Sequence, residues 1–288
     1  MGWYQEYKTS LKLIEVEEIF DIFFYRPAAF LLVKAIYNTR IAPNHLTLTA
    51  IAMGIISGFF FALGDPVTGA FFFLVFNILD CSDGQLARLK RNGTPMGKII
   101  DGLADYTATT AVFIGIAIGF ADRQENQHLW LMLLALTGIS IGIHSILVDF
   151  FRTRFLDYTL QQKSHFRENL TEFRKAYAIA KQKGHQLERF SIFIYLKYSA
   201  LQKILAAKRK RSRSFNVSPA DYYRKNRLMI RLWLLIGPTT QITNIIVCSL
   251  CHRIDLFMWI VLVVFNMLAS VLWIIQQGID FTYKPIHG

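Results

Sequence analysis

Residues 80–105 read DCSDGQLARLKRNGTPMGKIIDGLAD, and apolar segments lie on both sides of this stretch. Carboxylates at membrane depth cost a large free energy, so a group of them requires a compensating partner. Divalent metal ions are the expected partner, and two ions beside an arginine indicate chemistry on a phosphate. The stretch has the pattern D-x2-D-G-x2-A-R-x8-G-x3-D-x3-D, with fixed positions Asp80, Asp83, Gly84, Ala87, Arg88, Gly97, Asp101 and Asp105.

The aspartates occur in two pairs with helical spacing. Asp80 and Asp83 are three residues apart, and Asp101 and Asp105 are four apart, so each pair shares one face of a helix. A glycine and a proline between the pairs allow the chain to reverse. We therefore expect two antiparallel helices to bring these carboxylates into one pocket, where oxygen ligands favour Mg²⁺ or Mn²⁺ over zinc. A salt-bridge network with the nearby Lys and Arg residues is the alternative.

The composition indicates a membrane protein. The 288-residue chain is 53% hydrophobic, and its apolar residues come in long blocks, which predicts an all-α polytopic fold rather than a soluble enzyme. The second block reaches spanning length only if its helix continues through Asp80 towards Arg88, which would place the first two carboxylates at one membrane face. The six predicted transmembrane helices are 46–63, 66–80, 102–120, 129–151, 229–250 and 255–275.

Lys and Arg residues predict the orientation. Of the 32 in the chain, the expected outer loops contain only Arg123 and Arg253. The positive-inside rule therefore places both termini and the aspartates in the cytoplasm. The net charge is +12, and the densest basic run is KRKRSR at 208–213. Beside membrane spans such a run favours anionic membrane lipids as partners, and no nucleic acid is expected.

The N-terminal region is expected to be interfacial. No secretory signal is expected in residues 1–20, which contain four glutamates and no apolar core. The aromatic-rich residues 17–37 suit an amphipathic juxtamembrane helix in the cytoplasmic interface, kinked near Pro27. A soluble cytoplasmic helix is the alternative.

The remaining chain alternates membrane and cytoplasmic parts. Within the basic insert, residues 160–183 are expected to form a polar helix and 187–207 an amphipathic segment. The predicted organisation is an N-terminal cytoplasmic or interfacial helix at 1–45, four transmembrane helices with the aspartate motif at 46–151, a basic helical cytoplasmic insert at 152–228, two transmembrane helices at 229–275, and a cytoplasmic tail at 276–288.

The pattern at 80–105 resembles the signature of the CDP-alcohol phosphotransferases, integral membrane enzymes of phospholipid synthesis, at all eight fixed positions. The segment Pro43-Asn44-His45-Leu46-Thr47 resembles the P-N-x-[LI]-T start of that family's first span. The resemblance implies six transmembrane helices and a metal-dependent transferase. Related enzymes are commonly homodimers, and a homodimer is expected by that analogy alone.

The resemblance also implies residue roles. Asp80, Asp83, Asp101 and Asp105 would hold two Mg²⁺ or Mn²⁺ ions, and Asp105 would act as the catalytic general base. The residues implied to contact the CDP moiety are Asn44, Thr47, Asp83, Gly84, Ala87, Arg88 and Gly97.

The acceptor is predicted from three arginines. Arg152, Arg154 and Arg231 lie at the expected cytoplasmic face and would bind a phosphorylated acceptor, although ordinary positive-inside anchoring also explains them. We therefore expect phosphatidyl transfer from CDP-diacylglycerol to a small polar alcohol, with inositol phosphate or glycerol phosphate favoured and CMP released. The alternatives are a CDP-choline or CDP-ethanolamine:diacylglycerol phosphotransferase, a divalent cation transporter and a non-catalytic scaffold on the lipid surface.

Overall fold

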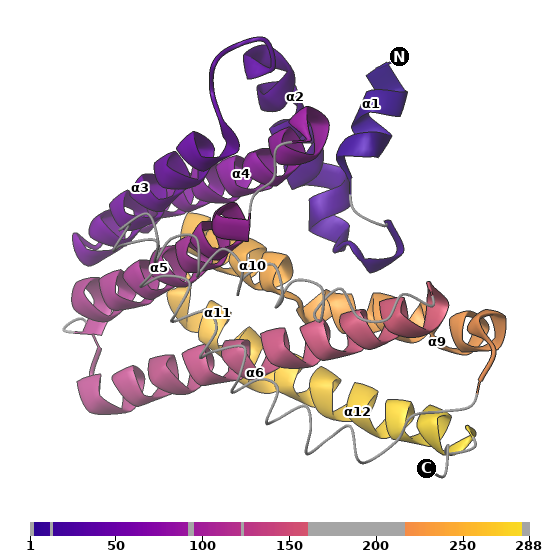
Figure 1. Ribbon diagram of the computed structural model, residues 1–288. Coiled ribbons are helices and arrows are strands. Elements are labelled where there is room, and N and C mark those ends of the chain that lie inside the picture. The colour runs from indigo at the N-terminus through magenta and orange to yellow at the C-terminus, as the bar shows by residue number, and fades with distance from the viewer. Residues whose placement is uncertain (1–2, 12–13, 92–94, 122–123, 161–216, 284–288) are drawn as a thin grey trace, which may run out of the picture.

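The computed structural model describes residues 3–11, 14–91, 95–121, 124–160 and 217–283, which form helices joined by short connections (Figure 1). No strand occurs among these residues, so the predicted all-α class is confirmed. In chain order the elements are α1 (Trp3–Ser10), η1 (Ile14–Val16), η2 (Asp21–Tyr25), α2 (Arg26–Ile36), α3 (Pro43–Ala62), α4 (Pro66–Lys90), α5 (Pro95–Phe120), α6 (Gln127–Thr159), α9 (Pro219–Trp233), η4 (Leu234–Ile236), α10 (Pro238–Leu250), α11 (Ile254–Trp259), η5 (Ile260–Phe265) and α12 (Asn266–Phe281).

Among the described residues, six helical segments are long and apolar enough to cross a membrane, and the chain is a multi-pass integral membrane protein. α4 contains 25 residues and continues to Lys90, as the shortness of the predicted span 66–80 requires. The aspartate motif therefore begins on a membrane-spanning helix rather than in a loop. The six segments are Pro43–Ala62, Pro66–Lys90, Ile100–Phe120, Gln127–Thr159, Pro219–Leu250 and Ile254–Phe281.

Both ends of the predicted insert 152–228 are helical extensions of membrane spans. α6 continues to Thr159, and α9 begins at Pro219 with Ser218 as its N-cap, whose hydroxyl accepts a hydrogen bond from the Asp221 amide. The helix predicted at 160–183 (apart from Leu160), the segment predicted at 187–207 and the basic run at 208–213 lie outside the described residues.

The last helix also runs past its predicted end at residue 275, into the predicted tail at 276–288. α12 continues to Phe281, because the polar residues after 275 face inwards and find partners there. Gln276 and Asp280 are both buried, and the Gln276 amide donates a hydrogen bond to the Asp280 carboxylate. The polar residues after position 275 therefore mark where α12 packs against polar partners inside the protein, and they do not mark the end of the helix.

α3 packs closely against α5 because small residues line their contact. A Cβ added at Gly115 of α5 would overlap the carbonyl oxygen of Gly58 on α3, and one added at Gly54 would overlap the Ala108 Cβ. Close backbone approach of this kind provides the van der Waals contact that holds helices together in lipid. It brings the start of α3 next to the aspartate motif.

The fifth span is broken into two helices. α9 ends at Trp233, a single 3₁₀ turn follows, and α10 starts at Pro238 with Gly237 in extended conformation as its N-cap. Pro238 cannot donate a hydrogen bond to the preceding turn, so a new helix begins there. The amides of the first turn of α10 consequently need acceptors from elsewhere in the fold.

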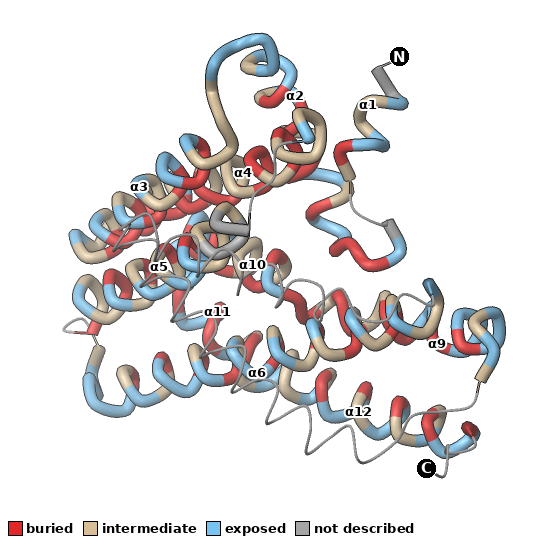
Figure 2. The backbone as a smooth tube through the Cα atoms, viewed as in Figure 1, coloured by how far each residue is buried: buried red, intermediate tan, exposed pale blue. Residues whose placement is uncertain are grey.

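The N-terminal strap, which we define as residues 3–11 and 14–36, packs along α4. Its π-helical turn η2 passes into α2 at Arg26, directly before Pro27, where the sequence predicts a kink. Tyr25 and Phe30 are fully buried, whereas Phe23 is 78% exposed. Figure 2 shows the same division throughout the molecule, with buried residues on the sides where the helices face one another.

Candidate active site

The aspartate motif converges from two helices. Asp80 and Asp83 lie on α4, Asp101 lies on α5, and one carboxylate oxygen from each lies within 4.8 Å of the other two. Asp105 is one helical turn further along α5 and is exposed. It lies outside this group of three but interacts electrostatically with Asp80 and Asp83. Three of the four predicted carboxylates therefore meet, two from α4 and one from α5.

The donor set fits a divalent cation. Asp80 Oδ1 is buried and has no hydrogen-bond partner, and a buried acceptor without a partner is costly. One carboxylate oxygen of Asp80 and one of Asp101 lie within 4.8 Å of each other, a closeness that like charges resist unless a cation lies between them. Three carboxylates suit the hard cations Mg²⁺ and Mn²⁺. Within the described part of the chain this is the one group of acidic, Cys or His side chains with such spacing.

α3 contributes to the site through its first turns. The Thr47 hydroxyl donates to the Asp83 carboxylate, and both side chains are buried. Asn44 is three residues earlier on the same helix and is half-buried, so it lies on the face that carries Thr47. Of the two α3 residues implied by the family resemblance, Thr47 therefore contacts the carboxylate group, and Asn44 lies on the same face of the helix.

Arg88 folds back along α4 towards the motif. A Cβ added at Gly84 would lie 3.4 Å from Arg88 Nη1, so the guanidinium group covers Gly84. Arg88 Nε donates to the carbonyl oxygen of Ser10 at 2.5 Å, and Nη2 is buried without a partner. Ala87 is half-buried beside Arg88, and Gly97 lies one turn before Asp101 on α5.

Arg88 and Lys90 do not form the salt-bridge network that is the alternative to a metal site. Lys90 Nζ donates to the carbonyl oxygens of Thr39 and Ile41, at 3.1 and 2.9 Å, and Arg88 donates to a carbonyl as well. Neither cation pairs with an aspartate of the motif, so the carboxylates of α4 are not neutralised by these two neighbours.

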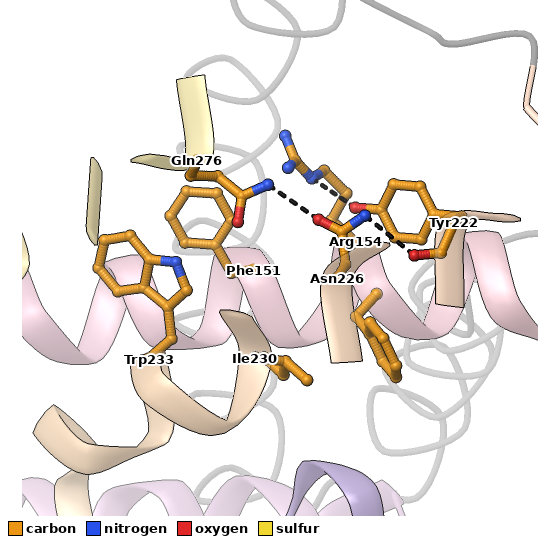
Figure 3. Close-up of a pocket in the computed structure, with 8 residues that line it drawn as sticks. Phe151, Arg154, Tyr222, Asn226, Ile230, Trp233 and Gln276 are labelled. Carbon is orange, nitrogen blue, oxygen red and sulfur yellow. Dashed lines mark hydrogen bonds between the residues drawn. The ribbon is translucent and has the colours of Figure 1, made fainter. Parts of the chain in front are cut away.

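Arg154 lies in a different cluster from the aspartates. Its guanidinium group binds both carboxylate oxygens of Asp280, at 2.7 and 2.8 Å, and Nε donates to the Tyr222 hydroxyl at 3.0 Å. Figure 3 shows Arg154 with its neighbours Tyr222, Asn226 and Gln276, and Asn226 links Tyr222 to Gln276. Every member comes from α6, α9 or α12, so Arg154 ties these three helices together.

The other two predicted acceptor arginines are placed differently. Arg152 lies 3.7 Å from the Glu18 carboxylate of the N-terminal strap, and its Nε is buried without a partner. Arg231 is half-buried on α9. Neither is held as firmly as Arg154.

We expect Arg154→Ala to lower the free energy of unfolding by about 3–5 kcal/mol, because Asp280 would be left buried without its cation. The matched control is Arg253→Ala, which breaks an exposed pair with Asp255 and should cost at most about 1 kcal/mol. Thermal melting of both variants in detergent measures the difference. Equal melting temperatures, together with weaker acceptor binding in Arg154→Ala, would instead assign Arg154 to the substrate.

The strap places a set of acidic residues in the interior, which the sequence analysis did not single out. Glu17 pairs with Arg26 at 3.0 Å, and both are buried. Glu18 is 2% exposed, and its burial raises its pKa to about 7. Asp21 accepts a hydrogen bond from the Thr239 hydroxyl at 3.1 Å. The available signal is the clustering of three acids with one arginine inside an aromatic segment.

The comparisons with known proteins cover the region of this site. Residues 40–165 match the family model described as CDP-alcohol phosphatidyltransferase. The chain is 36% identical over 76 residues to a CDP-diacylglycerol–inositol 3-phosphatidyltransferase of Rattus norvegicus and 34% identical over 76 residues to that of Homo sapiens; each match covers 26% of this chain and 35% of the relative. It is 25% identical over 118 residues, or 41% of this chain and 25% of the relative, to a bifunctional IPC transferase and DIPP synthase of Rubrobacter xylanophilus.

The chain thus spans about a third or less of the length of these curated relatives. The region matched by the family model nevertheless includes the whole aspartate motif, its Thr47 neighbour and the two helices that join them. On this sequence match and this arrangement of carboxylates, residues 40–165 form a domain similar to the CDP-alcohol phosphatidyltransferase family.

Proposed function

We propose that the protein transfers the phosphatidyl group of CDP-diacylglycerol to a small polar alcohol and releases CMP. The observation that carries this proposal is the convergence of Asp80, Asp83 and Asp101 within 4.8 Å, with the Arg88 guanidinium group folded along the same helix. The match of residues 40–165 to the family model supports the general reaction. The names of two relatives, which refer to CDP-diacylglycerol and inositol, favour a polyol acceptor, with inositol phosphate preferred over glycerol phosphate.

Four carboxylates are proposed to hold two divalent ions, Mg²⁺ or Mn²⁺. Asp80, Asp83 and Asp101 form the core of this group, and Asp105 would complete it from the exposed side. Bound there, the cations offset negative charge on the diphosphate and on the departing CMP. The Thr47 hydroxyl fixes the orientation of Asp83, so that its second oxygen can face the site.

The CDP moiety is proposed to lie along the start of α3 and the middle of α4. Gly84 and Ala87 leave room beside the α4 backbone, and Arg88 has a buried donor, Nη2, that a diphosphate oxygen would accept from. The remaining proposed contacts are Asn44, Thr47, Asp83 and Gly97, of which Thr47 and Asp83 are joined by a hydrogen bond.

Asp105 is proposed as the general base. It accepts the proton of the acceptor hydroxyl, whose oxygen forms a bond to the β-phosphorus of the CDP-lipid. The bond between that phosphorus and the oxygen that bridges the two phosphates breaks, and CMP leaves with the bridging oxygen. The exposure of Asp105 gives a water-soluble acceptor access to it. Arg152 and Arg231 are proposed to bind the acceptor phosphate, while Arg154 holds α6 to α12 through Asp280.

We also propose that both termini and the aspartate motif face the cytoplasm, where the water-soluble acceptor is available. The asymmetry of Lys and Arg residues supports this orientation, since only Arg123 and Arg253 fall in the expected outer loops. Anionic membrane lipids are proposed partners of the basic cytoplasmic side. A homodimer is proposed by family analogy.

The test is CMP release by the purified protein in mixed micelles with CDP-diacylglycerol, Mg²⁺ or Mn²⁺ and a panel of acceptors. We expect release with inositol phosphate or glycerol phosphate, and a rate with the preferred acceptor at least about tenfold above that with choline or ethanolamine. Release only from CDP-choline or CDP-ethanolamine with diacylglycerol would replace the proposed reaction. Metal flux through proteoliposomes without any CMP release would replace the enzyme with a cation transporter.

A further inference from the structure

The side of α4 that faces away from the aspartates is covered by the N-terminal strap. Residues between the fixed motif positions make most of these contacts. One face of α4 therefore carries the aspartates and the other face binds the strap. On α4, Cys81 Sγ lies 3.9 Å from the Asp21 carboxylate, the Ser82 hydroxyl donates to the Ala29 carbonyl at 3.4 Å, Gln85 Nε2 donates to the Arg26 carbonyl at 3.1 Å, and Arg88 Nε donates to the Ser10 carbonyl at 2.5 Å.

Arg88 is the one motif residue among these contacts. Ser10 is the last residue of α1 and is fully buried, and its hydroxyl donates to the Tyr7 carbonyl at 2.7 Å. Carbonyl groups at the end of a helix carry partial negative charge and favour a cation. The end of α1 therefore fixes the guanidinium plane of Arg88 before any substrate binds, while Nη2 stays available. Fixing a flexible side chain in advance removes an entropy cost from binding.

The same strap is anchored at its centre to the other half of the molecule. Glu18 Oε2 accepts hydrogen bonds from the Thr240 amide at 2.8 Å and from the Thr240 hydroxyl at 3.1 Å. Thr240 lies in the first turn of α10, whose amides lack intrahelical acceptors because the fifth span is broken at Gly237. Glu18 thus caps α10 across the fold, and Arg152 of α6 lies on its other oxygen.

A short path of contacts joins this anchor to α1. The Glu18 carbonyl accepts from the Ile22 amide at 3.1 Å, and the Ile22 carbonyl accepts from the Tyr7 hydroxyl at 3.5 Å. The Tyr7 ring packs edge-on against Phe30, with 5.1 Å between the ring centroids. Movement of Glu18 would therefore be transmitted to α1, and through the Ser10 carbonyl to Arg88.

We propose that Glu18 is a positioning residue for substrate binding: its carboxylate fixes the strap to α10, and the strap holds Arg88 where the diphosphate binds. This inference rests on the proposed function, which assigns Arg88 to the diphosphate. Glu18 itself touches no substrate and no reacting atom.

Two variants test the anchor from its two sides. Glu18→Ala removes the carboxylate, whereas Gly237→Ala adds a Cβ that would overlap the Glu18 carboxylate, while the backbone at Gly237 suits alanine (φ −72°). We expect KM for CDP-diacylglycerol to rise about fivefold in each and kcat to change less than about twofold, because Arg88 acts on binding. Gly237→Ala keeps the test decisive if Glu18→Ala does not fold.

Three control variants separate positioning from general damage. Glu15→Ala removes an exposed glutamate of the same strap, and Gly278→Ala adds a Cβ into open space on α12, so both should keep the wild-type KM. Glu18→Gln should also stay within about twofold of wild type. Its amide oxygen still accepts from Thr240, and a side chain with a pKa of about 7 tolerates a neutral replacement.

The decisive readout is a double-mutant cycle with Arg88→Ala. Glu18→Ala should raise KM no further once Arg88 is absent, because its effect passes through that side chain. The same rise with and without Arg88 would overturn the inference, as would an unchanged KM in both anchor variants of an active enzyme. Failure of the proposed function is distinguishable, since the wild type itself would then release no CMP.

Discussion

Replacing Asp80, Asp83 or Asp101 by asparagine is expected to reduce CMP release by at least about 10³-fold, the equivalent of about 4 kcal/mol in the activation barrier. Each replacement keeps the shape of the side chain but removes one negative charge from oxygens that lie within 4.8 Å of each other. The protein should still insert and fold. Removing one of several like charges relieves repulsion, so the melting temperature without added metal should hold or rise. CMP release checks the expected loss of activity, and thermal melting of the same preparations checks that stability is kept.

The matched control for these variants is Asp255→Asn. Asp255 is exposed at the start of α11 and pairs with Arg253, so its replacement should leave CMP release unchanged. Full turnover in any of the three motif variants would remove that carboxylate from the proposed metal site. Wild-type turnover in excess chelator would contradict metal dependence as a whole.

The convergence of the aspartates was predictable because it depends on local geometry. Spacings of three and four residues place side chains on one helical face, and a short reversal between two helices brings those faces together. The length of α4 was predictable for a similar reason, since an apolar segment of residues 66–80 is too short to span a bilayer unless the helix continues. Both predictions need only the residues of one hairpin.

The role of Arg154 could not be predicted in this way. Two arginines after an apolar span suggest an anion site or ordinary anchoring, and the acids nearest to them in the sequence are Asp149 and Asp157. The partner is Asp280, 126 residues later, in a segment predicted to be a tail. Because α12 continues past residue 275, that aspartate becomes buried opposite Arg154. An incorrect helix end therefore concealed an ion pair.

The strap is a second feature that local patterns do not reveal. Glu18 and Thr240 are 222 residues apart, and their contact exists because Gly237 and Pro238 break the fifth span and leave amides without acceptors. The Gly-Pro pair is visible in the sequence and predicts a break. Which side chain caps the new helix depends on the packing of α1 and α2 against α4, which hydropathy and spacing do not encode.

A large effect on stability is also expected at the contact between α3 and α5. Gly115→Ala adds a single methyl group, but its Cβ would overlap the Gly58 carbonyl oxygen, which belongs to backbone and cannot rotate away. The two helices would have to separate along their shared length. Helices in lipid lack a hydrophobic drive to associate, so lost van der Waals contact is not recovered elsewhere. We expect a loss of at least about 3 kcal/mol, at the upper end of overpacking effects, and no folded protein for Gly115→Leu.

The control is Gly102→Ala on the same helix, because an added Cβ there meets nothing within 4 Å and alanine favours the helix. The melting temperature of Gly115→Ala should lie several degrees below that of this control. Activity should fall as well, since α3 carries Thr47 against Asp83 while α5 carries Asp101, and separating the helices pulls the site apart. If Gly115→Ala and the control have the same melting temperature, then α3 and α5 do not pack as closely as described. The close packing of α3 against α5 would then no longer explain how the carboxylates are brought together.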